Sequence, residues 1–584
     1  MANKRKRLPY GVSDFKKVRL NDYYYVDKTG FIPSLEDYNY VLFLRPRRFG
    51  KSLFANMLKA YYDINYADKF DALFGELEIG KEPTPSHNTY LVLSFNFSGV
   101  DSKPENVQES FNRSALMSIE IFLSAYKEKL GEYAHEKVIE GTQNCAEALR
   151  ALSIITSEAG YKMYIVIDEY DNFANTLMSV NEDSYHDILH ADGFVRYFYN
   201  VLKEATTNNN AAIDRIFITG VSPLCLSDVT SGFNIARNLS TVPTFNNMVG
   251  FTEPEVMDML TYFTGSEETA KSLMPTARSY YDNYCFSKLA ARRNEHVFNS
   301  DMVLYFIDNY AANEEVTAEN LLDSNAKSDY VKLQSLARQG GSPEEKNAML
   351  QSILNNGYTT TDLKSEFQIR ELAETQNFVS MLFYLGLLTY GYSPDSQPAL
   401  VVANDAMRQQ YGTYLSTCYA KMMNWRTDQL MMSKLWMNWG VKGQWQPLIS
   451  YIASVMQEND SVRDFTPQAE SFVKGFMLAH LCKGNGYVVR TEAEMDHGYS
   501  DIYLYPIVPE YRNALVLELK YLKPTATDAE VESVRQAARK QVANYVADKR
   551  LQAEAEAKGW GLAAAVAVFR GWKVEAVEGF SVNS

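Results

Sequence analysis

Over residues 1–250, short apolar runs alternate with stretches whose apolar residues recur every three or four positions. The short runs predict buried strands, because parallel strands covered on both faces are continuously apolar. The stretch after the first run carries Phe54, Met57, Leu58 and Tyr61 on one stripe, which is typical of an amphipathic helix. The alternation predicts a parallel αβα sandwich. Its four expected strands are Tyr40–Leu44, Tyr90–Phe95, Tyr164–Ile167 and Ile216–Thr219.

Beyond residue 250 the pattern changes. Residues 251–375 are mostly helical in period, with breaks at Gly340-Gly341 and Gly357. The stretch Phe378–Tyr384 then precedes two short apolar runs around a turn at Ser393–Ser396, which predicts a winged-helix-like unit. The last part begins at Ala469 and predicts a helix, three strands, a helix and a final strand. These four strands are Tyr487–Thr491, Asp501–Tyr505, Ala514–Leu519 and Ala563–Phe569.

This division predicts an α/β protein of four domains. A P-loop-type sandwich covers 1–250, a helical lid or linker covers 251–375, a winged-helix-like module and linker covers 376–465, and an αβ domain covers 466–584. At roughly 150 residues per domain, a chain of 584 residues is long enough for three or four.

Composition narrows the classes of partner and compartment. No apolar run reaches the roughly 18 residues that a membrane helix requires, so we expect no membrane contact. Five cysteines are scattered singly, which argues against a disulfide framework or zinc site and favours the cytoplasm. The net charge of −15 argues against broad electrostatic affinity for nucleic acid.

The segment that joins the first strand to the first helix has the composition of a phosphate-binding loop. Gly50-Lys51-Ser52 matches the end of the pattern GxxxxGK[ST], although Arg45 stands where the first glycine is expected. Backbone N–H groups at a helix N-terminus bind anions, Lys51 adds a point charge, and the Ser52 hydroxyl can ligate Mg²⁺. The alternative is an ordinary strand-to-helix turn with a basic rim. The residues expected to bind ATP here are Arg47, Arg48, Phe49, Gly50, Lys51, Ser52 and Leu53.

A second strand ends in two carboxylates, Asp168 and Glu169. We expect Asp168 to hold the magnesium of the nucleotide and Glu169 to polarise the attacking water as a general base. A further strand ends in small polar groups, of which Thr219 or Ser222 could contact the γ-phosphate or be strand caps. Arg237 is a weaker candidate for sensing phosphate, since a lone arginine is more often a surface residue.

The C-terminal strands carry a second set of chemically active residues. Asp501 begins one strand, and Glu518 and Lys520 share one face of the next, because side chains alternate along a strand. If the two strands form a hairpin, Asp501 and Glu518 face each other and can bind Mg²⁺, with Lys520 orienting or deprotonating a water. Glu470 on the preceding helix could add a carboxylate, and Gln541 lies on the inward stripe of the following helix. The alternative is an exposed hairpin with a surface Glu–Lys pair.

These segments resemble a bacterial family, the AAA-ATPase-like proteins that carry a C-terminal PD-(D/E)XK nuclease domain. The resemblance rests on Leu8–Phe15, Tyr25–Thr29, Arg45–Ser52, Ile167–Asp171, Gly250–Glu253, Tyr384–Thr389 and Glu518–Lys520. It implies a restriction-endonuclease-like fold for the last domain, and it makes Arg45 a family trait of the P-loop. Two positions depart from the family pattern. Tyr499 replaces an arginine near the metal-binding aspartate, and Ala403 replaces a proline before Asn404.

The sequence supports three hypotheses. The first is an ATP-driven, magnesium-dependent nuclease that acts on DNA or RNA, with defence or nucleic-acid processing as its biological role. The second is a nucleotide-dependent switch or scaffold whose nuclease-like domain binds a partner without catalysis; the acidic charge and Tyr499 favour it. The third is a nucleic-acid-binding regulator that uses the winged-helix-like unit. Self-association of the chain stays open.

Overall fold

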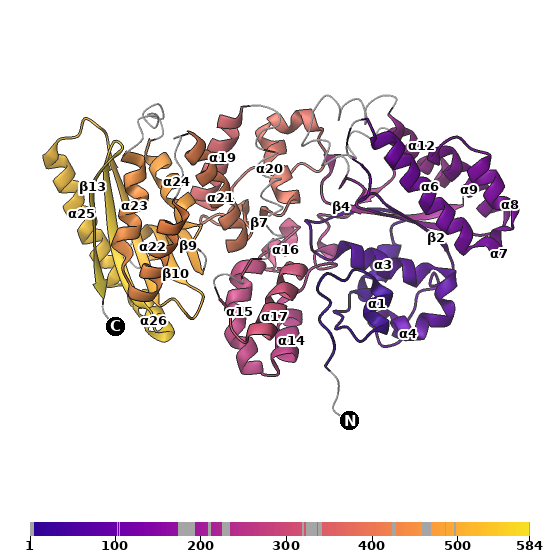
Figure 1. Cartoon of the computed structure of the whole chain (residues 1–584), viewed down its shortest axis with the longest axis horizontal. Coiled ribbons are helices and arrows are strands. Elements are labelled where there is room, and N and C mark those ends of the chain that lie inside the picture. Colours follow the sequence, from indigo (N-terminus) through magenta and orange to yellow (C-terminus); the bar gives the residue numbers. More distant parts are fainter. Residues whose placement is uncertain are drawn as a thin grey trace.

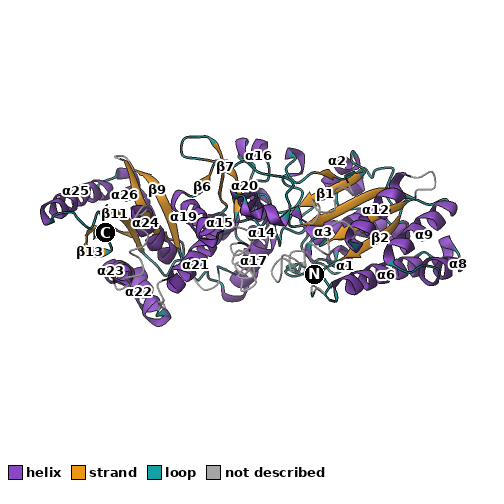
Figure 2. Ribbon diagram, turned by 90° about the horizontal axis from the view of Figure 1, so that it is seen from above, coloured by secondary structure: helices purple, strands orange, loops and turns teal. Residues whose placement is uncertain are grey.

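The structure is a computed structural model. It describes residues 5–101, 103, 105–172, 193–207, 212–224, 234–317, 321–322, 336, 342–422, 428–457, 469–484, 486–495 and 498–582. Two sheets lie at opposite ends of an elongated molecule, and helices fill most of the space between them (Figure 1, Figure 2). No described helix is both long enough and apolar enough to cross a membrane.

The first sheet has five parallel strands in the order β2-β3-β4-β1-β5. Helices α1, α3 and α4 lie on one of its faces, and α6, α9 and α12 on the other (Figure 1). The predicted parallel αβα sandwich is therefore confirmed. The strands are β1 (Tyr40–Leu44), β2 (Leu91–Asn96), β3 (Met163–Asp168), β4 (Ile213–Gly220) and β5 (Arg237–Asn238). The helices are α1 (Phe15–Leu20), α2 (Ile32–Glu36), α3 (Lys51–Tyr62), α4 (Phe70–Phe74), α5 (Glu78–Lys81), α6 (Val107–Ala125), α7 (Lys127–Leu130), α8 (Tyr133–His135), α9 (Cys145–Glu158) and α12 (Phe194–Thr207).

The middle of the chain is mainly helical and holds a small sheet of order β6-β8-β7. The predicted helix and hairpin are confirmed as α20, β7 and β8, and β6 adds a strand that the sequence pattern does not predict. Gly357 ends α19 with a φ of +80°, whereas Gly340 and Gly341 lie outside the described residues. The elements are α14 (Glu253–Thr264), α15 (Glu267–Tyr281), α16 (Lys288–Arg292), α17 (Ser300–Asn313), α19 (Pro343–Asn356), β6 (Tyr358–Thr359), α20 (Thr375–Tyr384), β7 (Leu388–Tyr392), β8 (Pro398–Val402), α21 (Asp405–Met422), α22 (Gln429–Lys442) and α23 (Trp445–Gln457).

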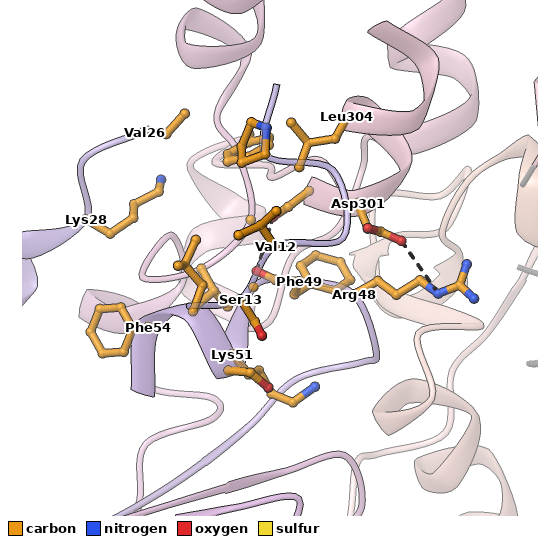
Figure 3. Close-up of a pocket in the computed structure, with 18 of the residues that line it drawn as sticks. Val12, Ser13, Val26, Lys28, Arg48, Phe49, Lys51, Phe54, Asp301 and Leu304 are labelled. Carbon is orange, nitrogen blue, oxygen red and sulfur yellow. Dashed lines mark hydrogen bonds and ion pairs between the residues drawn. The ribbon is translucent and has the colours of Figure 1, made fainter. Parts of the chain in front are cut away.

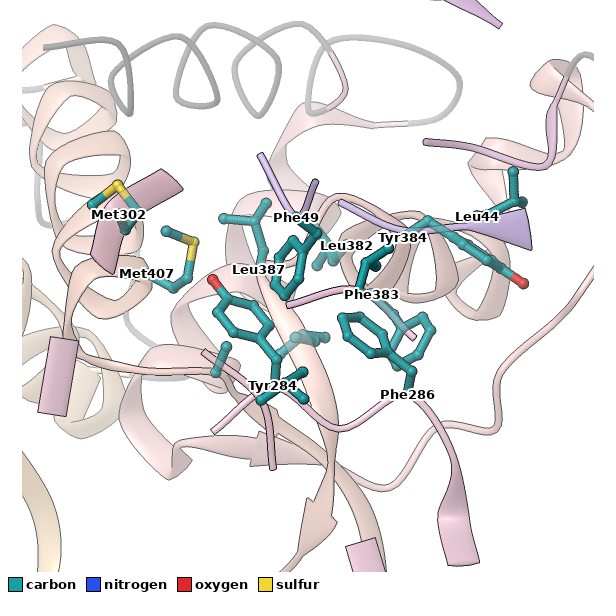
Figure 4. Close-up of a cluster of buried hydrophobic side chains, with 14 of the residues drawn as sticks. Leu44, Phe49, Tyr284, Phe286, Met302, Leu382, Phe383, Tyr384, Leu387 and Met407 are labelled. Carbon is teal, nitrogen blue, oxygen red and sulfur yellow. The ribbon is translucent and has the colours of Figure 1, made fainter. Parts of the chain in front are cut away.

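A buried cluster joins the first sheet to this middle region (Figure 4). Phe49, from the loop after β1, packs edge-on against Tyr284 and Phe286, with ring centroids 4.9 and 5.4 Å away. Phe286 in turn contacts Phe383 of α20. The loop after β1 is thus anchored in a core shared with residues more than 200 positions away. The four domain boundaries expected from the sequence stay predictions.

The second sheet is mixed, with the order β13-β12-β11-β10-β9. Leu515 and Leu517 of β11 belong to the core shared with α24, whereas Ala514 and Val516 belong to a separate core with α25. The predicted helix, three strands, helix and strand are confirmed, but the predicted final strand is followed by β13, and neither β13 nor α26 is predicted by the sequence pattern. The elements are α24 (Ala469–Leu481), β9 (Tyr487–Met495), β10 (Gly498–Pro506), β11 (Asn513–Leu522), α25 (Asp528–Val546), α26 (Lys549–Lys558), β12 (Gly561–Arg570) and β13 (Lys573–Val582).

Candidate functional site

The backbone carbonyls of the loop after β1 are held from outside the loop. Three consecutive residues at the start of α17 donate to them. Asn299 Nδ2 donates to Arg47 (3.4 Å), the Asp301 N–H to Arg48 (3.1 Å), and Ser300 Oγ to Phe49 (3.1 Å). Because the carbonyls are turned outward and satisfied, the loop can aim N–H groups inward.

The backbone N–H groups from Phe49 to Ser52 donate to no acceptor among the described residues. The first N–H groups of a helix have no partner inside the helix, and α3 begins at Lys51. Gly50 adopts a φ of +89°, a left-handed conformation that glycine enters without steric penalty. The loop and the start of the helix therefore have the geometry that binds an anion in other proteins.

Lys51 supplies the cation of this site. Its side chain is buried, and its ammonium donates to the carbonyl of Pro46 at 2.9 Å. Burial lowers the pKa of Lys51, and the nearby carboxylates of Glu169, Asp168 and Asp171 act in the opposite direction. A buried ammonium that is held by one carbonyl retains hydrogen-bond capacity for a phosphate.

The acidic pair after β3 splits into two environments. Asp168 is buried, and its Oδ1 accepts from the N–H of Glu169 at 3.0 Å. Glu169 is half-buried, has a φ of +54°, and lines the cavity described below. Burial, with the charges of Asp171 and Asp168, raises the pKa of Glu169. A raised pKa suits a group that accepts a proton near neutral pH.

A third carboxylate, Asp171, fixes the end of β3 to the end of β4. It is 1% exposed, and its two oxygens accept from the N–H groups of Val221 and Ser222 at 2.7 to 3.2 Å. A Cβ at Gly220 would clash with Asp171 and Tyr170, so only glycine fits there. The sequence pattern does not reveal this role, because it depends on contacts 50 residues apart.

A cavity of about 540 Å³ opens in front of the loop (Figure 3). Lys51, Ser52, Glu169, Asn172 and Ser98 give one part of its wall a polar character. The remainder is largely apolar and includes Val12 and Val26 from the N-terminal segment, Phe54 from α3, Met259 from α14 and Leu304 from α17. This size and division of character match a phosphorylated ligand with an apolar ring system.

The structure brings the predicted loop residues together but separates their roles. Arg47, Arg48, Phe49, Gly50, Lys51, Ser52 and Leu53 all line the cavity. The Phe49 ring is 1% exposed and packed in the core, so only its backbone is available to a ligand. Arg48 lies 3.8 Å from Asp301, and Arg47 donates to Asn172 at 3.3 Å.

Three residues expected to contact phosphate or water have other surroundings in the structure. The Thr219 hydroxyl is fully buried and donates to the carbonyl of Phe43 at 2.8 Å, which holds neighbouring strands together. Ser222 is fully buried, and its N–H donates to Asp171. Arg237 is exposed on the edge strand β5. None of the three lines the cavity.

The C-terminal sheet brings Asp501 and Glu518 side by side. Strands β10 and β11 are antiparallel and pair Ile502 with Leu517, so the next positions along the ladder are Asp501 and Glu518. Asp501 also accepts from the N–H of Leu519 at 2.8 Å. Desolvation and the Asp501 charge raise the pKa of Glu518.

Lys520 donates to Oε1 of Glu518 at 2.7 Å, but Oε2 of Glu518 is buried and has no partner in the described structure. A buried carboxylate oxygen without a partner is costly, and a bound cation would satisfy it. The residues present therefore fit a divalent metal held by Asp501 and Glu518.

The preceding helix brings a lysine to this pair. Lys474 lies 3.6 Å from Oδ1 of Asp501. Glu470, one turn earlier on α24, is exposed, and the described residues contain no group of three acidic, histidine or cysteine side chains that could hold a metal. The structure therefore does not bring Glu470 together with Asp501 and Glu518, and its expected role as a third metal ligand stays a prediction. Gln541 instead donates to the Tyr545 hydroxyl at 2.6 Å.

Two family models match the chain. Residues 9–230 match the model described as Predicted AAA-ATPase, and residues 468–579 match that of the PD-(D/E)XK nuclease superfamily. These matches confirm the resemblance found in the sequence. An uncharacterized protein in the vnfD 5′ region of Azotobacter chroococcum mcd 1 is 29% identical over 254 residues, which is 43% of this chain and 44% of that protein. The chain thus spans less than half the length of this curated relative.

Solved structures with low sequence identity are also similar to the chain. The Aeropyrum pernix ORC1 protein in complex with DNA is 16% identical, with a TM-score of 0.26 over 69% of this chain and 96% of that one. The Aeropyrum pernix ORC2 protein in ADPNP–ADP complexes is 11% identical, with a TM-score of 0.25 over 69% of this chain and 98% of that one. Cdc6p from Pyrobaculum aerophilum is 12% identical, with a TM-score of 0.22 over 71% and 96%.

Proposed function

We propose that this protein is a P-loop ATPase whose nucleotide state controls a magnesium-dependent nuclease site acting on nucleic acid. The observation that carries the proposal is that one chain holds both half-sites. The loop after β1 offers unused N–H groups and a buried lysine, and the second sheet offers two adjacent carboxylates with one unpartnered oxygen and a lysine.

At the first site the residues divide the work of hydrolysis. The N–H groups of Phe49 to Ser52 and the Lys51 ammonium bind and orient the phosphates, while the apolar wall around Val26 and Leu304 receives the base. The Ser52 hydroxyl and Asp168 would hold the magnesium that neutralises phosphate charge. Glu169 faces the cavity with a raised pKa and accepts a proton from the attacking water.

At the second site Asp501 and Glu518 would hold Mg²⁺, which supplies Lewis-acid stabilisation of the scissile phosphate. The Lys520 ammonium donates a hydrogen bond to Glu518 at 2.7 Å, and this contact holds it beside the two carboxylates. From there it orients the water that attacks the phosphodiester. Asp501 is itself positioned by the Leu519 N–H, which aligns β10 with β11 at the site.

Helices α17 and α15 connect the two ends. The start of α17 holds the loop carbonyls, and the N–H of Asn299 donates to the carbonyl of Tyr281, the last residue of α15, at 2.9 Å. Helix α15 also contacts the nuclease-like domain, because Thr276 Oγ1 donates to the carbonyl of Ile507 at 3.3 Å. A change at the loop on nucleotide binding therefore has a continuous route toward the second sheet.

The test is cleavage of single-stranded and duplex DNA and RNA by the full chain with Mg²⁺ or Mn²⁺, with and without ATP. We expect Glu518→Gln to lower cleavage at least about a hundredfold, the low end for a positioned catalytic group, and Lys51→Ala to abolish the effect of ATP. Glu556→Gln, an equal charge change at an exposed position of α26, serves as the control. Equal cleavage by wild type and Glu518→Gln would refute the nuclease assignment.

A specific observation favours the alternative of a nucleotide-dependent switch or scaffold. Lys474 and Lys520 already balance the charges of Asp501 and Glu518, and no third carboxylate joins them among the described residues. Under this alternative the second sheet binds a partner without chemistry. No cleavage by any form, under conditions where ATP binds and Lys51→Ala does not bind it, would select the switch.

A further inference from the structure

A second cavity, of about 850 Å³, lies where the helical middle meets the second sheet. Its wall takes residues from α14 and α15, from the β8–α21 connection, and from β9 and β10. It shares no lining residue with the cavity in front of the P-loop, and neither Asp501 nor Glu518 lines it. Most of its lining side chains are polar or charged, which distinguishes it from a packing gap between apolar helices.

Asp405, at the start of α21, is the anchor of this cavity and is already fully engaged. The Arg490 guanidinium of β9 donates to both of its oxygens, and the Ser279 hydroxyl of α15 donates to Oδ2. Asp405 is 3% exposed and the Arg490 side chain is 38% exposed, so this is a partly buried, bidentate ion pair that joins three segments. One carboxylate is thereby balanced by one guanidinium.

Arg408, one turn further along α21, is left without a matching anion. Its side chain is 12% exposed, and no hydrogen bond joins its guanidinium to any residue that the structure describes. Its nearest carboxylate oxygen belongs to Asp405, 4.0 Å away and already bound to Arg490. Burial and repulsion by Arg490 lower the pKa of Arg408. A buried guanidinium with unused donors is a strong site for a bidentate oxyanion.

The remaining charges indicate what kind of anion fits. Arg278 is paired with Glu253 at 2.5 Å, and Glu295 adds another negative charge to the wall. Asp282 Oδ1 is buried and has no partner in the described structure, so it awaits a hydrogen-bond donor. A nucleic-acid backbone would bring successive phosphates against Glu253 and Glu295. A small molecule with a single anionic group and a few hydrogen-bond donors would place no further negative charge against these glutamates.

We propose that this cavity binds a small phosphorylated molecule, of the nucleoside monophosphate class, with its phosphate on Arg408 and its hydroxyl or amino donors directed to Asp282. The cavity volume lies in the range of small-ligand sites. Free inorganic phosphate presents the same oxyanion without the donors, so the two sources are separable by experiment. The proposal does not depend on nuclease activity.

The test is titration calorimetry on the full chain carrying Lys51→Ala, which disables the first site, with AMP and with inorganic phosphate as probes. We expect AMP to bind more tightly than phosphate, and Arg408→Gln to weaken AMP about ten- to a hundredfold, as for lost charge-assisted hydrogen bonds. Arg278→Gln is the matched control, because it removes the same charge from the same cavity but from an arginine that already has a partner; we expect less than a threefold effect.

Several outcomes overturn the proposal. The first is that neither AMP nor phosphate binds with a dissociation constant below about 1 mM. The second is that Arg408→Gln binds AMP as tightly as the parent protein. The third is that a duplex oligonucleotide displaces AMP, which would make the cavity a nucleic-acid contact. A second readout guards against misfolding. If Arg408 serves a ligand, Arg408→Met should raise the melting temperature of the ligand-free protein, because it removes a buried charge whose neighbouring carboxylate, Asp405, is already bound to Arg490. A lower melting temperature would show that Arg408 is structural.

Discussion

Replacing Arg45 with glycine restores the full GxxxxGK[ST] pattern, and yet the structure predicts that Arg45→Gly damages the site. Arg45 is 1% exposed and donates to three backbone carbonyls, those of Leu44 (2.9 Å), Ser240 (2.6 Å) and Phe245 (2.8 Å). Its guanidinium also lies 4.3 Å from the ring of Phe43 and 4.1 Å from that of Phe286. It therefore fastens the end of β1 to two other segments.

The magnitude follows from these contacts. Three buried carbonyls left without donors cost about 1 kcal/mol each at the low end, and two lost ring contacts add about 0.5 kcal/mol each. Burial without a carboxylate lowers the pKa of Arg45 to about 9, so relief of that desolvation offsets part of the loss. The net destabilisation is about 3 kcal/mol, or roughly 6 to 12 °C in melting temperature for a domain of this size.

The assay pairs calorimetric melting with titration of a fluorescent ATP analogue. All six tryptophans lie at position 425 or later, so their fluorescence follows the C-terminal half as an internal control. We expect Arg45→Gly to weaken binding of the analogue at least tenfold. Arg45→Lys should weaken it similarly, because one ammonium cannot reach three carbonyls and also lie between two rings. Affinity within threefold of wild type and a melting temperature within 2 °C would refute the reasoning.

Three further predictions follow from buried or paired charges. Asp171→Ala should lower the free energy of unfolding by about 2 to 4 kcal/mol, since two N–H groups at the end of β4 lose their acceptor. Calorimetry should show this as a lower melting temperature, which an Asp→Ala change at an exposed position should not cause. Burial raises the pKa of Asp282 to about 6 from 3.8, so the folded state retains a proton that the unfolded state releases. Stability therefore falls as pH rises from about 4 to 6. Asp282→Asn should remove this loss of at most about 3 kcal/mol, and melting measured at pH 4 and at pH 8 would show it. Lys474→Met should tighten Mn²⁺ binding severalfold by calorimetry, because Lys474 no longer competes for Asp501; weaker binding would contradict this.

Local pattern was enough to predict four of the five strands in each of the two larger sheets, and the main candidates on them. Buried parallel strands are continuous apolar runs, so β1 to β4 are visible in the sequence, and the two-residue β5 is not. The strand period places Glu518 and Lys520 on one face, and a hairpin is the simplest connection that brings Asp501 beside them. Both inferences use only neighbours in sequence.

Residues whose roles depend on distant partners could not be placed in this way. Thr219 lies at the end of a strand, as a γ-phosphate contact would, but its hydroxyl donates to the carbonyl of Phe43, 176 positions away. Glu470 and Lys474 lie one helical turn apart, so a pattern cannot decide which of them reaches Asp501. The start of α17, which shapes the P-loop from 250 positions away, has no motif of its own.

Helix α15 joins the two ligand sites argued for above. Its last residue, Tyr281, accepts from Asn299 at the start of the helix that holds the P-loop carbonyls. Two residues earlier, Ser279 donates to Asp405, the anchor of the cavity that contains Arg408. A helix moves as a rigid rod, so a displacement at its P-loop end also moves the wall of the second cavity. Linkage then requires symmetry: the factor by which a phosphorylated ligand at Arg408 changes ATP affinity must equal the factor by which ATP changes affinity for that ligand.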